Sequence, residues 1–484
     1  MSKMIFDISS PGRKGCTLPK NDVSIDLKDC IPSKYMRQNT PELPEVSELD
    51  TMRHFIELSQ KNHCIEKGFY PLGSCTMKYN PKLHETLVKH SCFNNLHPLQ
   101  PNQTIQGALE IMYELQKDLA EISGFEKVSL QPVAGAQGEF TGLKVISAYH
   151  KAKGNTHKKK IILPDSAHGT NPASSTLVGF EVVEIKSNDQ GKVDLEELRK
   201  VADDSVAGFM LTNPNTLGLF ENQIEEIASI IHGVDGLMYM DGANLNALLG
   251  IVKPGEIGFD VMHINLHKTF GTPHGGGGPG SGPVGVRKDL VKFLPVPMVE
   301  TDGDQFFLDY GHAEHSIGKV HTFYGNFAIM LRAYIYIKML GAKGLRRVAE
   351  NAIINANYLQ SLLSEYYHIS HKDIHCMHEF VADGEWQKEK YGIRTLDIAK
   401  RLLDKGYHAP TIYFPLIIHE AIMIEPTETE SMETLDEFAA TMIEIAHECE
   451  TNPDLLLNAP FNTPVRRVDD TLAVRQLDIR YIRK

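Results

Sequence analysis

The sequence has no apolar run of about 18 residues or more, the length that a membrane-spanning helix requires. Residues 1–16 also lack the continuous apolar stretch of a secretory signal peptide. These two absences argue against a membrane protein and against a secreted one. We therefore expect a cytoplasmic protein without membrane contact.

Cysteine is sparse and poorly arranged for cross-linking. Seven cysteines are spread over 484 residues, and no two of them form a C-x-x-C pair. An odd number at such spacings disfavours both a disulfide framework and a zinc ribbon. We expect reduced thiols and predict no metal site.

Basic residues are also in deficit. The chain has 49 Lys and Arg against 62 Asp and Glu, which gives a net charge of −13. A general nucleic-acid-binding protein would show a clustered basic face. Only residues 466–484 are locally basic, and there a solvated or partner-contacting tail is the simpler interpretation. We predict no nucleic-acid partner.

The length and composition fit an ordinary globular protein of two or three domains, since 42% of the residues are hydrophobic and 23% are charged. Scattered prolines in residues 1–60 indicate an extended arm that lies on another surface, with a short helix over about 46–60. We predict a large domain over 61–325 that carries the site. A smaller C-terminal domain with a tail would then span 326–484.

The large domain shows the alternation of strands and helices that is typical of an α/β protein. Short apolar strands separated by helices or loops indicate a mostly parallel sheet with both faces covered. Residues 68–83, rich in Gly, Pro, Ser and Thr, read as a long and functional loop. The expected strands are a short one before residue 135, then 160–165, 178–186 after a loop, 208–214, 236–241 and 260–266; the expected helices are 104–122, 139–150, 194–203 and 221–232.

The pattern changes after Arg287 to a smaller α+β region. We expect a long helix over about 325–366 and further helices over 395–405 and 431–449. Two strand-like segments accompany them, one within 371–384 and one over 411–426.

Polar clusters follow four of the expected strands. In sheets of this kind, ligands bind outside the carboxyl ends of the strands. These ends should therefore form one site. The clusters are Asp165–His168, Thr212–Asn215, Asp241–Asn244 and His267–Thr269.

Lys268 is the most distinctive member of these clusters. It follows an apolar strand and precedes residues 271–281, which hold six glycines and two prolines. A lysine that points into a cleft among polar groups can lose its proton and act as a nucleophilic amine. Lys268 is therefore a candidate to form a Schiff base, although a lone lysine at a loop edge is usually a surface residue.

The neighbours of Lys268 fit pyridoxal phosphate. This cofactor needs a lysine for its aldehyde, a carboxylate for its ring nitrogen and a helix N-terminus for its phosphate. Asp241, 27 residues upstream, would supply the carboxylate, and His168 would lie flat on the ring. The remaining candidates for cofactor binding are the turn Gly135, Ala136 and Gln137 together with Thr212, Asn213, Ala243 and His267.

Competing motifs fail in their context. Gly275, Gly277 and Gly280 match G-x-G-x-x-G, but the run contains Pro279 and opens no helix, so it is no dinucleotide fingerprint. No P-loop and no H-E-x-x-H motif occurs. Taken singly, Asp241 could cap a helix and His168 could be an ordinary loop histidine.

Several longer segments carry a resemblance to a known family. They include GFYPLGSCTMKYNP, QPVAGAQGEF, HGTNPAS, TNPNTLGLFE, MDGANLNA, NLHKTFGTPHGGGGPG and NTPVRRVDDTLAVRQLDIRY. The chain resembles, nearly end to end, the glycine dehydrogenases (decarboxylating) that are the P-proteins of the glycine cleavage system, in their split two-chain form.

The resemblance implies a fold-type I, aminotransferase-like enzyme with pyridoxal 5'-phosphate on Lys268. It implies decarboxylation of glycine and transfer of the aminomethyl group to the lipoyl group of a carrier, the H-protein. It also implies a homologous subunit 1 in an α2β2 heterotetramer. By the residues alone, another fold-type I enzyme such as an amino-acid decarboxylase, or a non-catalytic binding subunit, stays open. The presence of Lys268 argues against the last of these.

Overall fold

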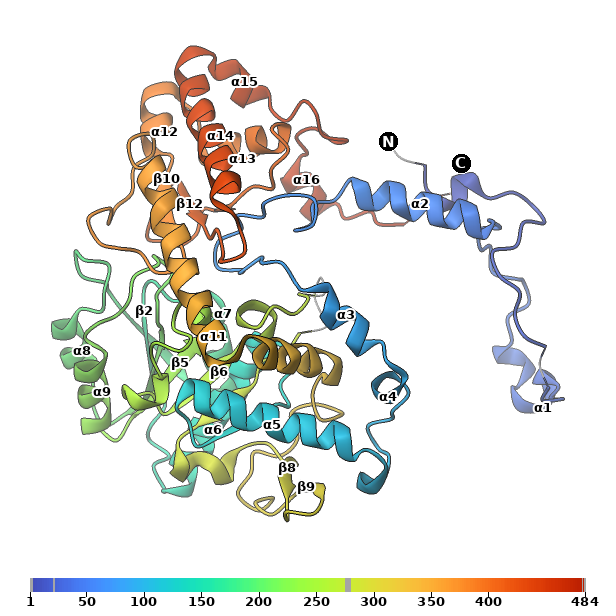
Figure 1. Ribbon diagram of the computed structural model, residues 1–484, viewed down its shortest axis with the longest axis horizontal. Helices are drawn as coiled ribbons and strands as arrows, with labels where there is room; N and C mark the ends of the chain where they lie inside the picture. Colours follow the sequence, from blue (N-terminus) through green and yellow to red (C-terminus); the bar gives the residue numbers. More distant parts are fainter. Residues whose placement is uncertain (1–2, 21, 275–279, 481, 483–484) are drawn as a thin grey trace. The chain divides into compact units, whose positions relative to one another are not determined.

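The computed structural model describes residues 3–20, 22–274, 280–480 and 482 (Figure 1). Gly275, Gly277 and Pro279 of the glycine run lie outside the described residues. The chain forms two compact units, one made of Met1–Gly68 with Ala459–Lys484 and the other of Phe69–Asn458. The division into an arm, a large domain and a small domain stays a prediction.

The first unit is mostly exposed and has little regular structure. Its longest helix is α2 (Glu48–Gln60), which confirms the helix expected over 46–60. The Ser47 hydroxyl caps this helix by accepting the Asp50 N–H at 3.1 Å, while the Asp50 carboxylate accepts the Ser47 N–H at 3.4 Å. No side chain of α2 is buried, and Phe55 is 55% exposed. The other short helices of the unit are η1 (Ile5–Ile8), α1 (Leu27–Cys30), η2 (Ser33–Tyr35) and α16 (Asp470–Arg475).

The second unit contains a seven-stranded sheet in the order β1-β7-β6-β5-β4-β2-β3. Five strands, from β6 to β3 in this order, are parallel, and β7 and β1 add an antiparallel edge. The largely parallel sheet expected from the sequence is thus confirmed. The strands are β1 (Lys127–Ser129), β2 (Lys160–Pro164), β3 (Glu181–Ile185), β4 (Val206–Thr212), β5 (Leu237–Gly242), β6 (Val261–Ile264) and β7 (Val284–Val286).

The central strands of this sheet are buried on both faces, because their alternate residues enter different cores. Phe209 and Met240 belong to the core formed with α5 (Gln106–Ser123), α9 (Ile224–Gly233) and α11 (Phe327–Leu363). Met210 and Tyr239 belong to the core formed with α6 (Gly135–Ala152). Burial on both sides explains why these strands read as continuous apolar runs in the sequence.

Two expectations about the connections of the large sheet were wrong. The loop expected between residues 165 and 178 contains helix α7 (Thr170–Val178). Pro172 sits in its first turn, where a backbone N–H has no partner inside the helix, so proline is tolerated there. The strand expected over 260–266 ends at Ile264, and Lys268 lies in the one-turn helix α10 (Leu266–Thr269).

The C-terminal part of this unit builds a second, antiparallel sheet in the order β10-β12-β11. The single strand expected over 411–426 is two antiparallel strands, because the segment turns back between them and Pro415 has no N–H to donate to a ladder. The elements are β10 (Phe380–Asp383), α12 (Glu385–Tyr391), α13 (Thr395–Asp404), β11 (Thr411–Ile412), β12 (Ala421–Ile424), α14 (Met432–Thr451) and α15 (Pro453–Asn458).

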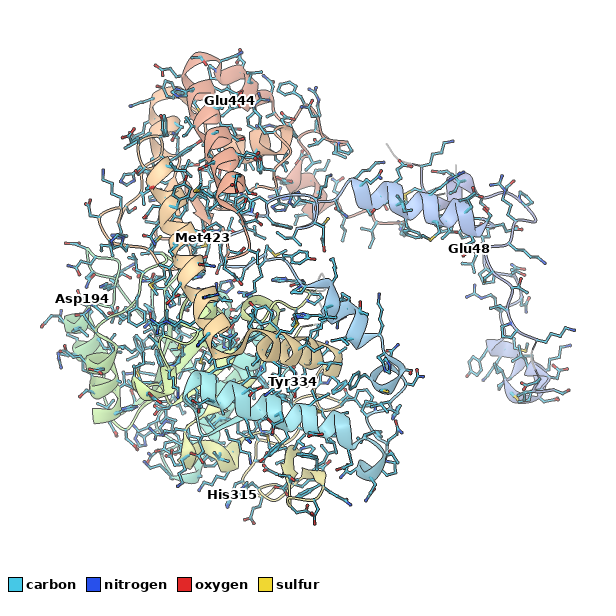
Figure 2. All side chains as sticks on the ribbon, in the orientation of Figure 1. Glu48, Asp194, His315, Tyr334, Met423 and Glu444 are labelled. Atoms are coloured by element: carbon cyan, nitrogen blue, oxygen red, sulfur yellow. The ribbon has the colours of Figure 1, made fainter. Side chains whose placement is uncertain are left out.

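The small sheet packs through β12 against the segment that follows β4. Ile422 and Ile424 point to a core with α11 and α14, while Met423, labelled in Figure 2, packs on the other face with Leu217 and Leu219 from the segment after β4. Met423 therefore belongs to an apolar contact between the small sheet and the segments that follow the strands of the large sheet.

The remaining elements connect and cover these sheets. No helix in the described ranges combines the length and the hydropathy needed to cross a membrane. The elements are α3 (Lys82–Val88), α4 (Ser91–Asn94), η3 (Asn102–Thr104), α8 (Leu195–Val201), η4 (Leu245–Ala247), η5 (Pro254–Glu256), η6 (Lys288–Phe293), β8 (Met298–Thr301) and β9 (Phe306–Asp309).

The close contact of α6 with the sheet gives the first prediction. A Cβ at Gly142 would lie 2.9 Å from Val261 Cγ1 and would also collide with the Tyr239 ring. Overpacking of this kind costs about 1–3 kcal/mol, more than the gain of about 1 kcal/mol from alanine's helix propensity. Gly142→Ala should therefore lower the midpoint of thermal unfolding. Gly107→Ala in α5, where a Cβ meets nothing within 4 Å, is the matched control and should not lower it.

Candidate active site

A cavity of about 210 Å³ opens at the carboxyl ends of β4, β5 and β6. Most of the expected site residues meet there. The cavity is lined by Ser74, Gly135, Ala136, Glu139, His168, Thr170, Thr212, Thr216, Asp241, Ala243, Asn244, His263, Asn265, His267 and Lys268.

Lys268 reaches the cavity from α10. Its Nζ donates a hydrogen bond to the carbonyl oxygen of Ser74 at 2.8 Å, and the side chain is half-buried. This neutral acceptor is the only hydrogen-bond partner that the described residues give the amine. Lys268 is therefore held in place without a direct ion pair, as a nucleophilic amine requires.

Lys78 also lies close to α10, but its amine is fully engaged in an ion pair and hydrogen bonds. Its Nζ forms an ion pair with Glu428 at 2.7 Å and donates to the Thr269 carbonyl at 2.6 Å and to the Tyr336 hydroxyl at 3.1 Å. Burial opposes its charge, but the Glu428 carboxylate outweighs burial and raises the pKa of Lys78. Lys78 thus stays protonated and is no competitor for the nucleophile.

Asp241 is the buried carboxylate of the cavity. One oxygen accepts from the Asn171 amide at 3.0 Å, and the other accepts from the Ala243 N–H at 3.0 Å. Burial alone would raise the pKa of Asp241, but the nearby His263 ring and these two hydrogen bonds lower it. Asp241 therefore remains ionised inside the protein and can face a cationic nitrogen.

His263 contacts Asp241, and Tyr239 in turn contacts His263. His263 Nε2 lies 3.3 Å from Asp241 Oδ1, and His263 Nδ1 lies 2.9 Å from the Tyr239 hydroxyl. Burial raises the pKa of Tyr239 well above its usual value, so the phenol stays neutral. The sequence analysis missed His263, although a histidine inside an apolar strand is itself a signal.

The N-terminus of α6 borders the cavity with the backbone of Gly135 and Ala136. No side chain caps this helix, so its first N–H groups remain available to an anion. A Cβ at Gly135 would lie 2.6 Å from Asn265 Oδ1, so a larger residue here would displace the Asn265 side chain. Gln137 does not line the cavity. Its side chain accepts the Val133 N–H at 2.7 Å and donates to the Val320 carbonyl at 2.7 Å, which ties down the turn.

His168 lies in the segment between β2 and α7 and faces the cavity. Its Nδ1 accepts the Thr170 N–H at 3.2 Å and lies 2.9 Å from the Thr170 hydroxyl, and these contacts orient the ring. The hydroxyl of Thr170 donates to Glu139 at 2.6 Å, and Ser174 donates to the same carboxylate at 2.8 Å. The sequence analysis also missed Glu139, whose carboxylate completes this side of the cavity.

Of the remaining candidates for cofactor binding, some line the cavity and others do not. Thr212 lines the cavity, and its hydroxyl has no partner within the described part of the chain. His267 lines it too, and burial lowers the pKa of His267 to about 3, so its ring is neutral. Asn213 does not line the cavity. Its side chain instead accepts the Glu221 N–H at 3.0 Å and donates to the Glu221 carbonyl at 3.3 Å.

The donors and acceptors of the cavity suit a phosphorylated aromatic cofactor. An uncapped helix N-terminus, an ionised carboxylate and an amine without an ion pair face one space. Buried polar atoms without partners among the described residues, including Thr212 Oγ1 and Asn265 Oδ1, are also ready to bind a ligand. Fold and cavity together define an enzyme of the fold-type I pyridoxal-phosphate class.

Comparison with known proteins specifies the family. Residues 20–306 match the family "Glycine cleavage system P-protein", and residues 348–459 match "Glycine dehydrogenase, C-terminal domain". The chain is 58% identical over 482 residues to a "Probable glycine dehydrogenase (decarboxylating) subunit 2" of Caldanaerobacter subterraneus subsp. tengcongensis, with 99% of each chain covered. The chain therefore belongs to the P-protein family of the glycine cleavage system.

Solved structures agree on the fold. A glycine decarboxylase (P-protein) in inhibitor-bound form superposes with a TM-score of 0.73 at 21% identity, over 87% of this chain and 94% of that one. A sphingosine-1-phosphate lyase of Burkholderia pseudomallei superposes with a TM-score of 0.64 at 14% identity, over 88% and 96%. These structures confirm the expected fold class. Membership of the P-protein family confirms glycine decarboxylation and the pyridoxal phosphate cofactor.

The contrast between the two lysines gives a prediction about stability. Lys78→Met should lower the free energy of unfolding by about 3–5 kcal/mol, because it leaves the buried Glu428 carboxylate unpaired. Adding Glu428→Gln should recover part of this loss in chemical denaturation. Lys200→Met, which breaks an exposed pair with Glu197, is the matched control and should change little. Wild-type stability in Lys78→Met would contradict a structural role for the Lys78–Glu428 ion pair.

Proposed function

We propose that Lys268 is the residue that binds the cofactor aldehyde covalently in this glycine decarboxylase. The observation that supports it is the pairing of a lysine without a direct ion pair and an ionised aspartate on one cavity. When bound, pyridoxal phosphate supplies an electron sink for the electron pair that remains after glycine loses carbon dioxide.

The surrounding residues would then have distinct tasks. Asp241 would hold a proton at the ring nitrogen, because its carboxylate is ionised and fixed by Asn171 and Ala243. The N–H groups of Gly135 and Ala136 would bind the phosphate, and the hydroxyl of Thr212 would bind the ring oxygen or the substrate. His168 would lie against the ring. These roles rest on the placement of the side chains in the cavity.

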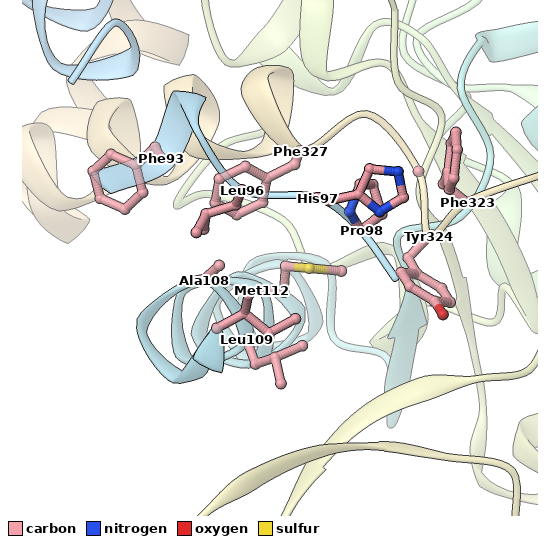
Figure 3. Close-up of a pocket in the computed structure, with 12 residues that line it drawn as sticks. Phe93, Leu96, His97, Pro98, Ala108, Leu109, Met112, Phe323, Tyr324 and Phe327 are labelled. Carbon is pink, nitrogen blue, oxygen red and sulfur yellow. The ribbon is translucent and has the colours of Figure 1, made fainter. Parts of the chain in front are cut away.

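A wider opening borders the site and suits the second substrate. A cavity of about 700 Å³ shares His267 with the Lys268 cavity and is lined further by His274, His321 and Phe323. It in turn shares Pro98, Phe323 and Phe327 with the apolar cavity in Figure 3, where Leu109 and Met112 face them from α5. We propose that this series of spaces admits the lipoyl arm of the H-protein, which takes the aminomethyl group.

A partner chain would complete the assembly. The relative from Caldanaerobacter is named "subunit 2", and by that likeness we infer a homologous subunit 1 in an α2β2 heterotetramer. The exposed apolar side chains of α2 support this proposal, because Met52 and Phe55 are 54% and 55% exposed in the isolated chain. The cytoplasm as the site of action stays a prediction.

Chemical trapping tests the assignment of Lys268. Borohydride reduction of the protein loaded with pyridoxal phosphate should place the pyridoxyl adduct in the peptide containing NLHKTF. Mass mapping of the digest reads the position. The same treatment of Lys268→Ala should give no adduct, and an adduct on Lys78 in the unmodified sequence would reject the proposal.

Replacing the carboxylate tests Asp241. Asp241→Asn should keep the fold but lower turnover by about two orders of magnitude or more, since one preorganised electrostatic partner in a site closed to water contributes about 2.7–4 kcal/mol. Asp260→Asn is the matched control, because Asp260 is a buried aspartate that pairs with Arg287 at the other end of the sheet. It should lower stability and leave the cofactor spectrum unchanged. Normal turnover in Asp241→Asn would assign the ring nitrogen to another group.

Reconstitution tests the partner. The purified chain should retain pyridoxal phosphate but show little exchange between glycine and labelled carbon dioxide until the partner chain is added. The partner mixed with Lys268→Ala should stay inactive, which locates the chemistry on this chain. Full exchange by this chain as a homodimer would refute the heteromeric assembly.

A further inference from the structure

Two glutamates that the proposed chemistry does not use lie next to Lys268. Glu379 precedes β10 and Glu425 follows β12, and these antiparallel neighbours pair Phe380 with Ile424. The two carboxylates therefore lie side by side, and both residues are fully buried. Neither one lines the cavity of Lys268. Among the described residues no lysine or arginine is bonded to this buried acidic pair, so the pair calls for an explanation.

Both carboxylates bind the same short turn. Glu379 Oε2 accepts the Ser74 N–H at 2.6 Å. Glu425 accepts the Thr76 N–H at 2.8 Å and the Thr76 hydroxyl at 2.6 Å. The turn of residues 74–76 is thus fastened to the small sheet by its backbone.

The backbone of this turn is in an unfavourable conformation, and its Ser74 carbonyl contacts Lys268. Ser74 and Thr76 have φ values of 63° and 49°, a region that a β-branched residue such as threonine rarely occupies. Gly73 just before them packs so closely on β12 that a Cβ would lie 2.6 Å from the Met423 carbonyl oxygen. This conformation places the Ser74 carbonyl where it accepts the hydrogen bond from Lys268 Nζ.

The groups around the pair determine its charge. Burial raises the pKa of Glu379 well above its usual value and that of Glu425 to about 7. Burial also lowers the pKa of His378 to about 3 and raises that of Cys75 to about 11, so both of these groups are neutral. The charged neighbours are Lys268 and Glu428, and the latter is paired with Lys78.

One further contact belongs to Glu379. Its Oε1 lies 3.6 Å from Nε2 of His378, and neither atom has a hydrogen-bond partner within the described residues. A neutral imidazole beside a carboxyl group fits a glutamate that keeps its proton. Glu379 therefore keeps its proton at neutral pH, and Glu425 takes on the single negative charge of the pair as the pH rises through about 7.

We propose that Glu379 and Glu425 are positioning residues for Lys268: they hold the turn of residues 74–76 so that the Ser74 carbonyl meets the lysine amine, and together they keep one negative charge beside it. This inference rests on Lys268 as the cofactor lysine. The turn gives the amine a fixed acceptor whenever it is not bonded to the cofactor. The single charge favours a protonated nitrogen on Lys268.

The test compares Glu379→Gln with the double variant Glu379→Gln/Glu425→Gln, each loaded with pyridoxal phosphate. The measured quantity is the pH midpoint at which the absorbance of the bound cofactor changes. Glu379→Gln mimics the protonated acid and should keep the wild-type midpoint. The double variant removes the negative charge and should lower the midpoint by about one pH unit, since a nearby opposite charge shifts a pKa by about 1–3 units.

The matched control is Glu420→Gln. Glu420 is another buried glutamate beside β12, but it binds Thr395 and Lys388 and not the turn of residues 74–76. This variant should keep the wild-type midpoint. A double variant that folds, carries the adduct on Lys268 and keeps the wild-type midpoint would overturn the inference. An adduct on another lysine would instead reject the proposed function.

A second measurement keeps the inference testable when the double variant does not fold. Infrared spectra at a pH well above 7, where Glu425 is ionised, should show the carbonyl band of a protonated carboxyl group in the wild-type protein. Glu379→Gln should remove this band. An identical band in both proteins would show that Glu379 does not carry the proton, and the inference would fall.

Discussion

The register of three parallel strands is the constraint on which the site depends. Thr212 on β4 pairs with Asp241 on β5, and Asp241 pairs with His263 on β6. Three polar residues thus form one row across the end of a sheet whose two faces are otherwise apolar. A shift of one residue in any strand would turn the side chain into the opposite core. The hydrophobic burial that fixes the register therefore also places the carboxylate and its partners.

Much of the fold could be predicted from the sequence because burial on both faces leaves a plain signal. The runs that became β2, β4, β5 and β6 are short and mostly apolar, and the polar clusters lie at or just after the ends of these strands. The same logic predicted that Lys268, Asp241 and His168 would meet. The antiparallel strands β11 and β12 were misread as one, since their apolar residues continue through the turn that separates them.

The sequence could not show where individual side chains point. Gln137 and Asn213 occur in the expected segments, yet neighbouring backbone groups capture both amides. His263 and Glu139 were missed because their roles depend on the register of β6 and on the approach of α7 to α6. Glu379 and Glu425 lie far apart in the sequence, and only the pairing of β10 with β12 brings them together.

The segment after Gly68 contacts both the small sheet and helix α10, and this has a mechanical consequence. The Thr411 hydroxyl donates to the Gly73 carbonyl at 2.8 Å, Leu72 bridges to Ile424, and the Ser74 carbonyl accepts from Lys268. A rotation of the small sheet would therefore carry the Ser74 carbonyl with it and change the length of its bond to the amine. The position of this oxygen atom therefore couples the surroundings of the Lys268 amine to the position of the small sheet.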